Sequence, residues 1–336
     1  MIFPISSIFF FFSLIMGTTL AISSSSWFGA WIGLELNLMS FIPLIISKMS
    51  PYSSEAALKY FLIQALASTL IILSSCLIMR SSNLTLMIIL MALLLKLGAA
   101  PFHFWFPQIM EGLSWLQTII LMTIQKLAPM FLISYLTLTP LAAQIILLSA
   151  ILSAHVGALG GLNIMKLRKI MAFSSINHMS WMLVALIIND SLWMMYFFFY
   201  SIISSSIVLF FHSLQLFSIS DLLTFSHSTL FSSILIPISL LSLGGLPPFT
   251  GFIPKWMMIQ AMLMNNMFFP LLFLLSSALI TLYFYLRILI PFILILIPIP
   301  SYNLKSMPTF SFSFSLPLII FSNSIGLFLP ILFLLF

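Results

Sequence analysis

The chain is a series of long apolar runs separated by short polar segments. A membrane-spanning helix needs about 20 mostly apolar residues, so the sequence was divided where charges, Pro, Gly, Asn and Ser clusters interrupt these runs. Eleven spans are predicted: 3–22, 27–47, 56–79, 84–109, 113–136, 141–161, 169–188, 191–217, 231–263, 269–295 and 313–335. Strands of a membrane barrel would alternate apolar and polar positions over about ten residues, whereas runs such as 268–286 are apolar on every face. The pattern therefore predicts an all-α, polytopic membrane protein.

Composition supports this class and excludes others. Hydrophobic residues make up 62% of the 336 residues and charged residues only 5%, against roughly 25% charged in a soluble domain. A mean hydropathy of +1.26 excludes intrinsic disorder. The net charge of +6 comes from basic residues scattered between apolar runs, so membrane topology explains it and no nucleic-acid partner is predicted. The single cysteine, Cys76, cannot form an internal disulfide.

The basic residues also predict an orientation. Most of them flank loops on one side of the predicted membrane, namely Lys48, Lys59, Lys166, Arg168, Lys169, Arg287 and Lys305, with Arg80 as the main exception. The positive-inside rule assigns that side to the bacterial cytoplasm or the mitochondrial matrix. The N-terminus is expected on the same side, and the C-terminus, after eleven spans, on the opposite side. No basic leader precedes Glu35, the first ionisable residue, which favours synthesis on the side of the membrane where the protein is used.

Two of the predicted spans are too long for one helix and are interrupted near the middle. Residues 98–101 and 244–254 are rich in Gly and Pro, and both segments predict broken helices. Backbone groups released at a break must be buried in protein or line water. The broken spans are the fourth and the ninth, so spans one to five and six to ten are interpreted as two inverted repeats with a site near the midplane. Two unrelated Pro-Gly hinges are the alternative.

Four charged residues lie at membrane depth: Glu35, Lys96, Lys126 and Lys255. A charge at the centre of a spanning helix costs roughly 2.5–3.5 kcal/mol on insertion scales, which indicates a function. Structural ion pairing is the alternative, but one carboxylate cannot neutralise three ammonium groups. Burial disfavours the charged form of a lysine, and a nearby carboxylate favours it. The four residues therefore predict a proton-transfer site.

Prolines near these lysines are expected to free backbone carbonyl groups for the proton path. Pro101, Pro129 and Pro254 donate no backbone hydrogen bond, so carbonyl groups beside the lysines become available to water.

Histidines are weaker candidates. His103 and His178 lie near polar residues or span ends and are secondary candidates for the proton path, whereas His155 is expected to pack or to hydrogen-bond. The five histidines show no metal-ligand spacing, and no nucleotide or haem motif is present. Neither a metal nor a cofactor is predicted in this chain.

Six segments carry a resemblance to a known family. They are WIGLELNLMSFIPLI (31–45), EAALKYFLIQA (55–65), LKLGAAPFHFWFP (95–107), QKLAP (125–129), GGLNIMKLRKIMAFSSINHMSW (160–181) and SLGGLPPFTGFIPKW (242–256). In this order they resemble the antiporter-like membrane subunits of NADH–ubiquinone oxidoreductase, respiratory complex I, and most specifically the subunit 2 family of animal mitochondria. From about Pro300 the chain matches only in being apolar.

The resemblance implies a multi-pass subunit of the mitochondrial inner membrane that takes part in proton pumping. It implies a single membrane domain over 1–336, with an antiporter-like core at 24–287 and a C-terminal helix region at 300–336. The family's functional glutamate and three lysines match Glu35, Lys96, Lys126 and Lys255. NADH, FMN, iron–sulfur clusters and ubiquinone would be used by other subunits, and the expected partners are membrane-arm subunits and phospholipid. A stand-alone cation/proton antiporter and a non-pumping scaffold remain the alternatives.

Overall fold

The computed structural model describes residues 5–46, 50–77, 82–224, 230–247 and 249–295. Within this part the chain is helical, and its one isolated β-bridge pairs Lys166 with Ser218. Eight of the described helical stretches are long and apolar enough to cross a membrane. The predicted all-α class is thus confirmed. The predicted span 313–335, the region 300–336, and Lys48, Arg80, His227 and Lys305 lie outside the described residues.

In the part of the first half that the structure describes, the chain forms seven helices. They are α1 (Ile5–Ser23), α2 (Trp27–Ile45), α3 (Pro51–Leu77), α4 (Ser82–Leu97), α5 (Trp105–Gly112), α6 (Trp115–Met122) and α7 (Ile124–Leu136). Helix starts follow local chemistry: the Oγ of Ser26 accepts a hydrogen bond of 3.2 Å from the N–H of Gly29, as expected of an N-cap serine. Pro51 occupies the first position of α3, where its missing N–H costs nothing.

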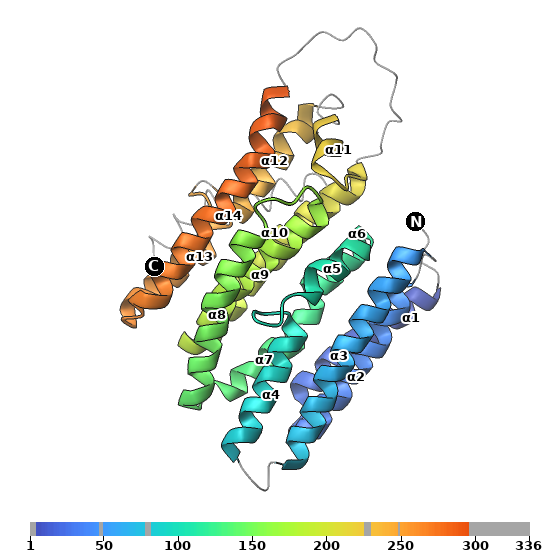
Figure 1. The fold of residues 1–336 in the computed structure, drawn as a ribbon, viewed down its shortest axis with the longest axis vertical. Helices are drawn as coiled ribbons and strands as arrows, with labels where there is room; N and C mark the ends of the chain where they lie inside the picture. Colours follow the sequence, from blue (N-terminus) through green and yellow to red (C-terminus); the bar gives the residue numbers. More distant parts are fainter. Residues whose placement is uncertain (1–4, 47–49, 78–81, 225–229, 248, 296–336) are drawn as a thin grey trace.

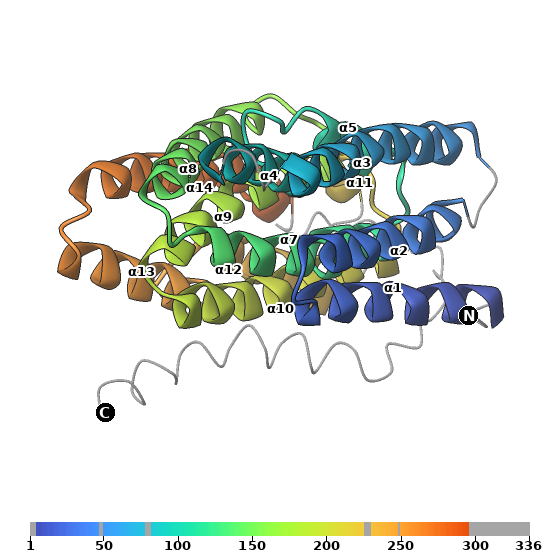
Figure 2. The same cartoon turned by 90° about the horizontal axis from the view of Figure 1, so that it is seen from below.

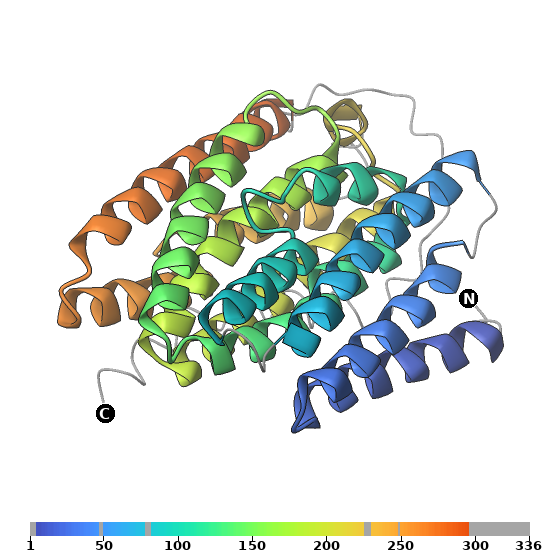
Figure 3. The same ribbon diagram turned by 60° about the horizontal axis from the view of Figure 1, so that its bottom comes forward.

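The described residues of the second half form seven more helices. They are α8 (Pro140–Gly160), α9 (Leu167–Ile188), α10 (Asp190–Leu214), α11 (Ile219–Thr224), α12 (Leu230–Gly244), α13 (Phe252–Met264) and α14 (Phe268–Ile295). The hairpin α1–α2 lies at one edge of the bundle and the pair α13–α14 at the opposite edge (Figures 1 and 3). Helices α7 and α9 run between two outer layers in the view of Figure 2, with α4 and α8 on one side and α1 and α10 on the other. Their central position makes them the natural carriers of buried polar groups.

Both predicted helix breaks are present, and they have the same geometry. Helix α4 ends at Leu97 and α12 at Gly244, and each is followed by a glycine in the left-handed region, Gly98 with φ 70° and Gly245 with φ 76°. At the first break the N–H of Gly98 bonds to Leu95 O (3.1 Å) and that of Ala99 to Leu94 O (3.2 Å). These two bonds define a Schellman motif.

The second break repeats the motif. The N–H of Gly245 bonds to Ser242 O (3.0 Å) and that of Leu246 to Leu241 O (3.4 Å). This break covers 245–251, so Phe252, Ile253 and Pro254, predicted within it, already belong to α13.

One predicted span contains an irregularity that the sequence did not predict. Span 113–136 corresponds to the stretch Trp115–Leu136, which is long and apolar enough to cross a membrane, but the structure divides this stretch into α6 and α7 at Thr123, whose φ and ψ are −114° and −80°. The side chain of Thr123 donates a hydrogen bond of 2.6 Å to Ile119 O, and such back-bonding by threonine bends helices. The interruption lies three residues before Lys126 and is a third irregularity near the candidate site.

Candidate functional site

Glu35 and Lys96 interact electrostatically within the first half of the chain. Lys96 lies in the last turn of α4 and is buried, with 6% of its surface exposed. Glu35 lies on α2 and is half-buried. Its carboxylate interacts electrostatically with the Lys96 ammonium, although no ion pair within 4.0 Å joins these two described side chains.

A small cavity joins Lys96 to Lys126. Both lysines line it, together with the polar side chains of Asn37, Tyr60, Gln64 and Gln125. The volume open to the centre of a water molecule is about 20 Å³, and about 10–15 Å³ holds one water. The cavity therefore has room for water in contact with two ammonium groups that are otherwise enclosed by apolar helices.

An amide network forms one wall of this cavity. The Nε2 of Gln125 donates to Asn37 Oδ1 (2.8 Å), and the hydroxyl of Tyr60 donates to Gln125 Oε1 (3.1 Å). The Nε2 of Gln64 donates to the carbonyl oxygen of Lys96 (3.3 Å) at the end of α4. Sequence reasoning missed these four residues. The available signal was that three amides and a tyrosine interrupt apolar spans at depths close to those of Glu35 and Lys126.

Lys126 lies between the two halves of the chain. It is 3% exposed on the first turn of α7. Its Nζ lies 3.5 Å from the carbonyl oxygen of Ser175 on α9 and 3.5 Å from the hydroxyl of Tyr200 on α10. It also lies 5.4 Å from the ring centre of Phe106 and 5.0 Å from that of Tyr200. The ammonium group is therefore surrounded by two rings and two weak acceptors.

His178 continues the row of polar groups beyond Lys126. Its Nδ1 lies 2.9 Å from the hydroxyl of Tyr196, and its ring centre lies 5.2 Å from that of Tyr200. Both Lys126 and Lys255 act electrostatically on it. A second cavity, of about 10 Å³ by the same measure, is lined by His178, Tyr196 and Tyr200, by Ser242 in the last turn of α12 and by Gly251 of the second break. The site thus extends from α7 to the break between α12 and α13.

Lys255 closes the row at the second break. Its Nζ donates a hydrogen bond of 2.8 Å to the carbonyl oxygen of Gly244, and its side-chain carbons pack over Gly245. The carbonyl group of Thr250 was expected to be free because Pro254 donates no backbone hydrogen bond. It is not free, because it accepts a hydrogen bond of 3.2 Å from the N–H of Ile253.

The structure brings some predicted candidates together and leaves one apart. Lys96 and Lys126 line the same cavity. Glu35 interacts electrostatically with Lys96, and Lys126 and Lys255 both interact electrostatically with His178. His103 lies in the segment between α4 and α5, where its Nδ1 lies 3.2 Å from Pro101 O and its ring contacts that of Phe104. Its contacts therefore lie within the first break and do not reach the lysines. His155 packs edge-on against Phe273, as predicted for a packing residue.

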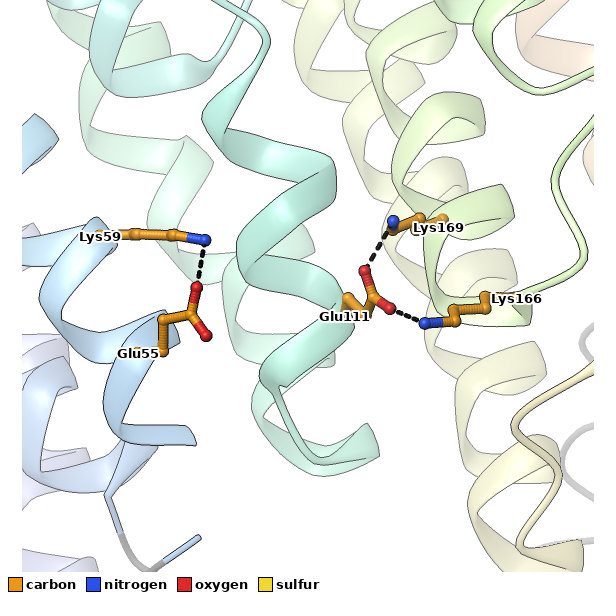
Figure 4. Close-up of polar contacts among 5 residues, drawn as sticks. All are labelled: Glu55, Lys59, Glu111, Lys166 and Lys169. Atoms are coloured by element: carbon orange, nitrogen blue, oxygen red, sulfur yellow. Dashed lines mark hydrogen bonds and ion pairs between the residues drawn. The ribbon is translucent and has the colours of Figure 1, made fainter. Parts of the chain in front are cut away.

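A second charged cluster lies at one end of the bundle (Figure 4). Glu111, at the end of α5, forms ion pairs with Lys166 and Lys169 of the segment that begins α9, the latter at 2.6 Å. Partial burial raises the pKa of Glu111, but the hydrogen bonds and charges of the two lysines outweigh it and hold the pKa below its usual value. Arg168 donates to the carbonyl oxygen of Leu113 and lies 5.1 Å from the Phe217 ring. This cluster joins the first half of the chain to the second.

The fold and the row of buried lysines define a polytopic membrane protein with titratable groups buried among its helices beside small cavities. The chain belongs to the NADH:quinone oxidoreductase/Mrp antiporter family of transmembrane proteins, whose family model matches residues 24–87 and 80–281. Within that family it is 48% identical to NADH-ubiquinone oxidoreductase chain 2 of Anopheles gambiae over 293 residues, which cover 84% of this chain and 85% of that one. It is 46% identical to the same chain of Aedes aegypti over 292 residues, or 84% of each chain.

Solved structures share the fold at lower identity. A chain of respiratory complex I from Thermus thermophilus matches with a TM-score of 0.83 and 20% identity, over 98% of this chain and 79% of that one. A chain of the Mrp complex from Dietzia sp. DQ12-45-1b matches with a TM-score of 0.73 and 16% identity, over 83% of this chain and 59% of that one.

Proposed function

We propose that the chain is a membrane-arm subunit of mitochondrial NADH–ubiquinone oxidoreductase and translocates protons across the inner membrane. One observation carries the proposal: Lys96, Lys126 and Lys255 are all buried, Lys96 and Lys126 share a water-sized cavity, and both Lys126 and Lys255 act electrostatically on His178, which lines a second cavity. Buried charges are costly in a membrane and mark ion pathways. The identity of 48% to a relative named as chain 2 of this oxidoreductase supports the assignment to that complex.

The proposed roles follow the geometry. Glu35 favours the charged form of Lys96, so its approach or withdrawal loads or releases a proton there. Water in the first cavity carries the proton to Lys126. His178 and the second cavity connect Lys126 with Lys255. No cofactor is proposed within this chain, since NADH oxidation and quinone reduction would take place on other subunits.

The proposed topology has eleven spans, ten of them in two inverted repeats. Two matched features support it. Both broken helices end in the same Schellman motif at Gly98 and Gly245. In addition, a Cβ on Gly17 of α1 would lie 2.8 Å from the backbone nitrogen of Asn37 on α2, and one on Gly157 of α8 would lie 2.6 Å from that of Asn177 on α9. The same sequence separation and the same close contact recur in each half. We assign 24–287 to the translocating core and 300–336 to a C-terminal region.

The proposed orientation places the N-terminus in the matrix and the C-terminus on the intermembrane side. Lys59, Lys166 and Lys169 gather at one end of the bundle (Figure 4), as the positive-inside rule expects of the matrix side. The remaining surface would contact neighbouring membrane-arm subunits and phospholipid. Exposed apolar side chains such as Phe9, Phe12, Leu62 and Leu66 suit both kinds of neighbour.

Substitution of Lys126 tests the proposal in the assembled complex. Lys126→Met keeps the apolar stem and removes the proton-carrying group, so assembly should persist while NADH–quinone turnover and proton pumping fall together. Lys126→Arg should also be impaired, since a guanidinium group does not release its proton. Both rates are measured per assembled complex. Normal pumping in the Met variant would remove Lys126 from the path.

The likeness to an Mrp-complex chain supports a second candidate, a cation/proton antiporter that acts without redox partners. Purification settles the choice: the proposed subunit should be recovered only within a large NADH-oxidising assembly, whereas an antiporter would transport when reconstituted alone. A non-pumping scaffold predicts the opposite ranking of the Lys126 variants, with Arg nearly harmless and Met destabilising.

A further inference from the structure

The three buried lysines are stabilised in three different ways. Lys96 has the carboxylate of Glu35 nearby. Lys255 has a short hydrogen bond to Gly244 O at the carbonyl end of α12, where the helix dipole favours a cation. No ion pair joins Lys126 to any of the five acidic side chains, all of which lie within the described residues. Something other than an anion must therefore stabilise its charged form.

The hydrogen bonds of Lys126 are too long to fill that role. Both acceptors, Ser175 O and the Tyr200 hydroxyl, lie at 3.5 Å, beyond the 2.7–3.2 Å of a well-formed bond (about 2.9 Å being the most common). The rings are better placed. Phe106 and Tyr200 lie at 5.4 and 5.0 Å, inside the roughly 6 Å over which an aromatic face attracts a cation. Both side chains are buried, and an aromatic face attracts a buried cation more strongly than an exposed one.

The two rings also mark the junction between the two cavities. Phe106, on α5 just after the first break, lines the cavity shared by Lys96 and Lys126. Tyr200, on α10, lines the cavity that reaches the second break. Each ring thus belongs to a different half of the chain, and the Lys126 ammonium lies close to both. The Lys126 ammonium therefore lies between a residue that lines the first cavity and a residue that lines the second.

We propose that Phe106 and Tyr200 are positioning residues that hold the charged Lys126 side chain at the junction of the two cavities. The inference rests on the proposed proton-translocating function and assigns to the two rings the part that a carboxylate plays at Lys96. The aromatic faces stabilise the ammonium group without binding it as an anion would. Lys126 can therefore hold a proton and still release it to either cavity.

Ring-removing and ring-keeping variants test this in the assembled complex. Phe106→Leu and Tyr200→Leu remove a ring, whereas Phe106→Tyr and Tyr200→Phe keep it. A buried cation–π contact is worth about 1–2 kcal/mol, or about a 5- to 30-fold change in the stability of the charged form. Ring removal should lower turnover and pumping per assembled complex by a comparable factor, with KM for quinone unchanged because quinone binds elsewhere. The ring-keeping variants should retain most of both rates. If a Leu variant fails to assemble, Phe106→Met or Tyr200→Met fills more of the volume and takes its place.

Two controls separate the possible outcomes. Phe211→Leu removes an equally buried ring that packs on Trp115 rather than on a lysine, and it should leave turnover per assembled complex near the wild-type value. Equal loss in this variant would overturn the inference, as would normal pumping in both ring-removing variants. The double variant Phe106→Leu/Lys126→Met should lose no more turnover than Lys126→Met alone. If Lys126→Met itself pumps normally, Lys126 is not on the proton path and the proposed role on which this inference rests fails; if it is inactive while the ring-removing variants pump, only the present inference fails.

Discussion

The ammonium group of Lys255 donates a 2.8 Å hydrogen bond to the carbonyl oxygen of Gly244, the last residue of α12. The bond crosses the break, since Lys255 lies on α13. It satisfies one of the carbonyl groups that a helix end leaves open and places a positive charge at the negative end of the helix dipole. The charged side chain of Lys255 therefore also links α12 to α13 across the break. Loss of the proton from Lys255 would weaken this contact and loosen the break.

Gly245→Ala should disturb this arrangement. Gly245 has φ 76°, a conformation that costs an L-residue roughly 1–2 kcal/mol. Its Cβ would also lie 2.7 Å from Cδ of Lys255, so the lysine would have to leave its place over the glycine. We expect a lower melting temperature of the complex and slower proton pumping per assembled complex.

Gly244→Ala is the matched control for that variant. The neighbouring glycine lies at the end of α12, where an added Cβ would meet only Cδ2 of Tyr285 at 3.7 Å and Cγ of Leu282 at 4.0 Å. Alanine favours a helix over glycine by about 0.5–1 kcal/mol. This variant should be as stable as the wild type and should pump normally. Equal damage at both positions would show that the break tolerates no side chain, whatever its backbone angle.

Much of the fold could be predicted because membrane helices are long apolar runs with polar ends. The two breaks were also predictable, since Gly98 and Gly245 adopt angles that other residues rarely adopt. The interruption at Thr123 was not, because no glycine or proline lies within five residues of it and the bend depends on a side-chain bond to Ile119 O.

The lining of the site was harder to predict than its lysines. Charges at membrane depth stand out in an apolar sequence, but the network of Gln125, Asn37 and Tyr60 depends on how three helices are rotated against one another. Helices that are apolar on every face carry no pattern that fixes this rotation. Packing fixes it instead, for example where Gly17 allows α1 to approach the backbone of α2 at Asn37.

Gln125→Leu should slow proton transfer between Lys96 and Lys126. The substitution nearly preserves volume but leaves Asn37 Oδ1 and the Tyr60 hydroxyl without their partner. An unsatisfied buried polar group costs about 1–3 kcal/mol, and the first cavity loses a polar wall. Turnover and pumping per assembled complex should both fall. Gln144→Leu serves as the control, because Gln144 is exposed on α8; if it causes the same loss, the effect does not come from the network.

Gly17→Ala and Gly157→Ala should have similar effects if the two halves are structural repeats. In each case the added methyl group would lie within 2.8 Å of a backbone nitrogen on the next helix, so the helices must move apart. Overpacking of this kind costs about 1–3 kcal/mol. We expect both variants to reduce the amount of assembled complex to a similar degree. An effect in only one half would argue against equivalent hairpins.

The cluster around Glu111 should make stability depend on pH. Glu111 pairs with Lys166 and Lys169 across the junction of the two halves, and its pKa lies below the usual value of 4.5 because these partners outweigh the effect of partial burial. A carboxyl whose pKa is lowered by folding stabilises the folded state above its unfolded pKa, and the contribution is lost as the pH falls through the folded pKa. The stabilising contribution is therefore complete at neutral pH and disappears in acid.

Glu111→Gln should consequently lower the melting temperature of the complex at pH 7, and the difference from the wild type should shrink as the pH falls below about 4.5. The expected contribution to the free energy of unfolding is about 0.5–1 kcal/mol, because pairs that are partly exposed are screened by solvent.

Glu55→Gln is the matched control: Glu55 pairs with Lys59 one turn away on the same helix, and both side chains are largely exposed (Figure 4). Its removal should change the melting temperature little at any pH, since the pair joins no separate elements. Melting curves of both variants and the wild type between pH 4 and pH 8 measure these differences. A constant difference for Glu111→Gln across that range would mean that the carboxylate charge does not stabilise the junction between the two halves.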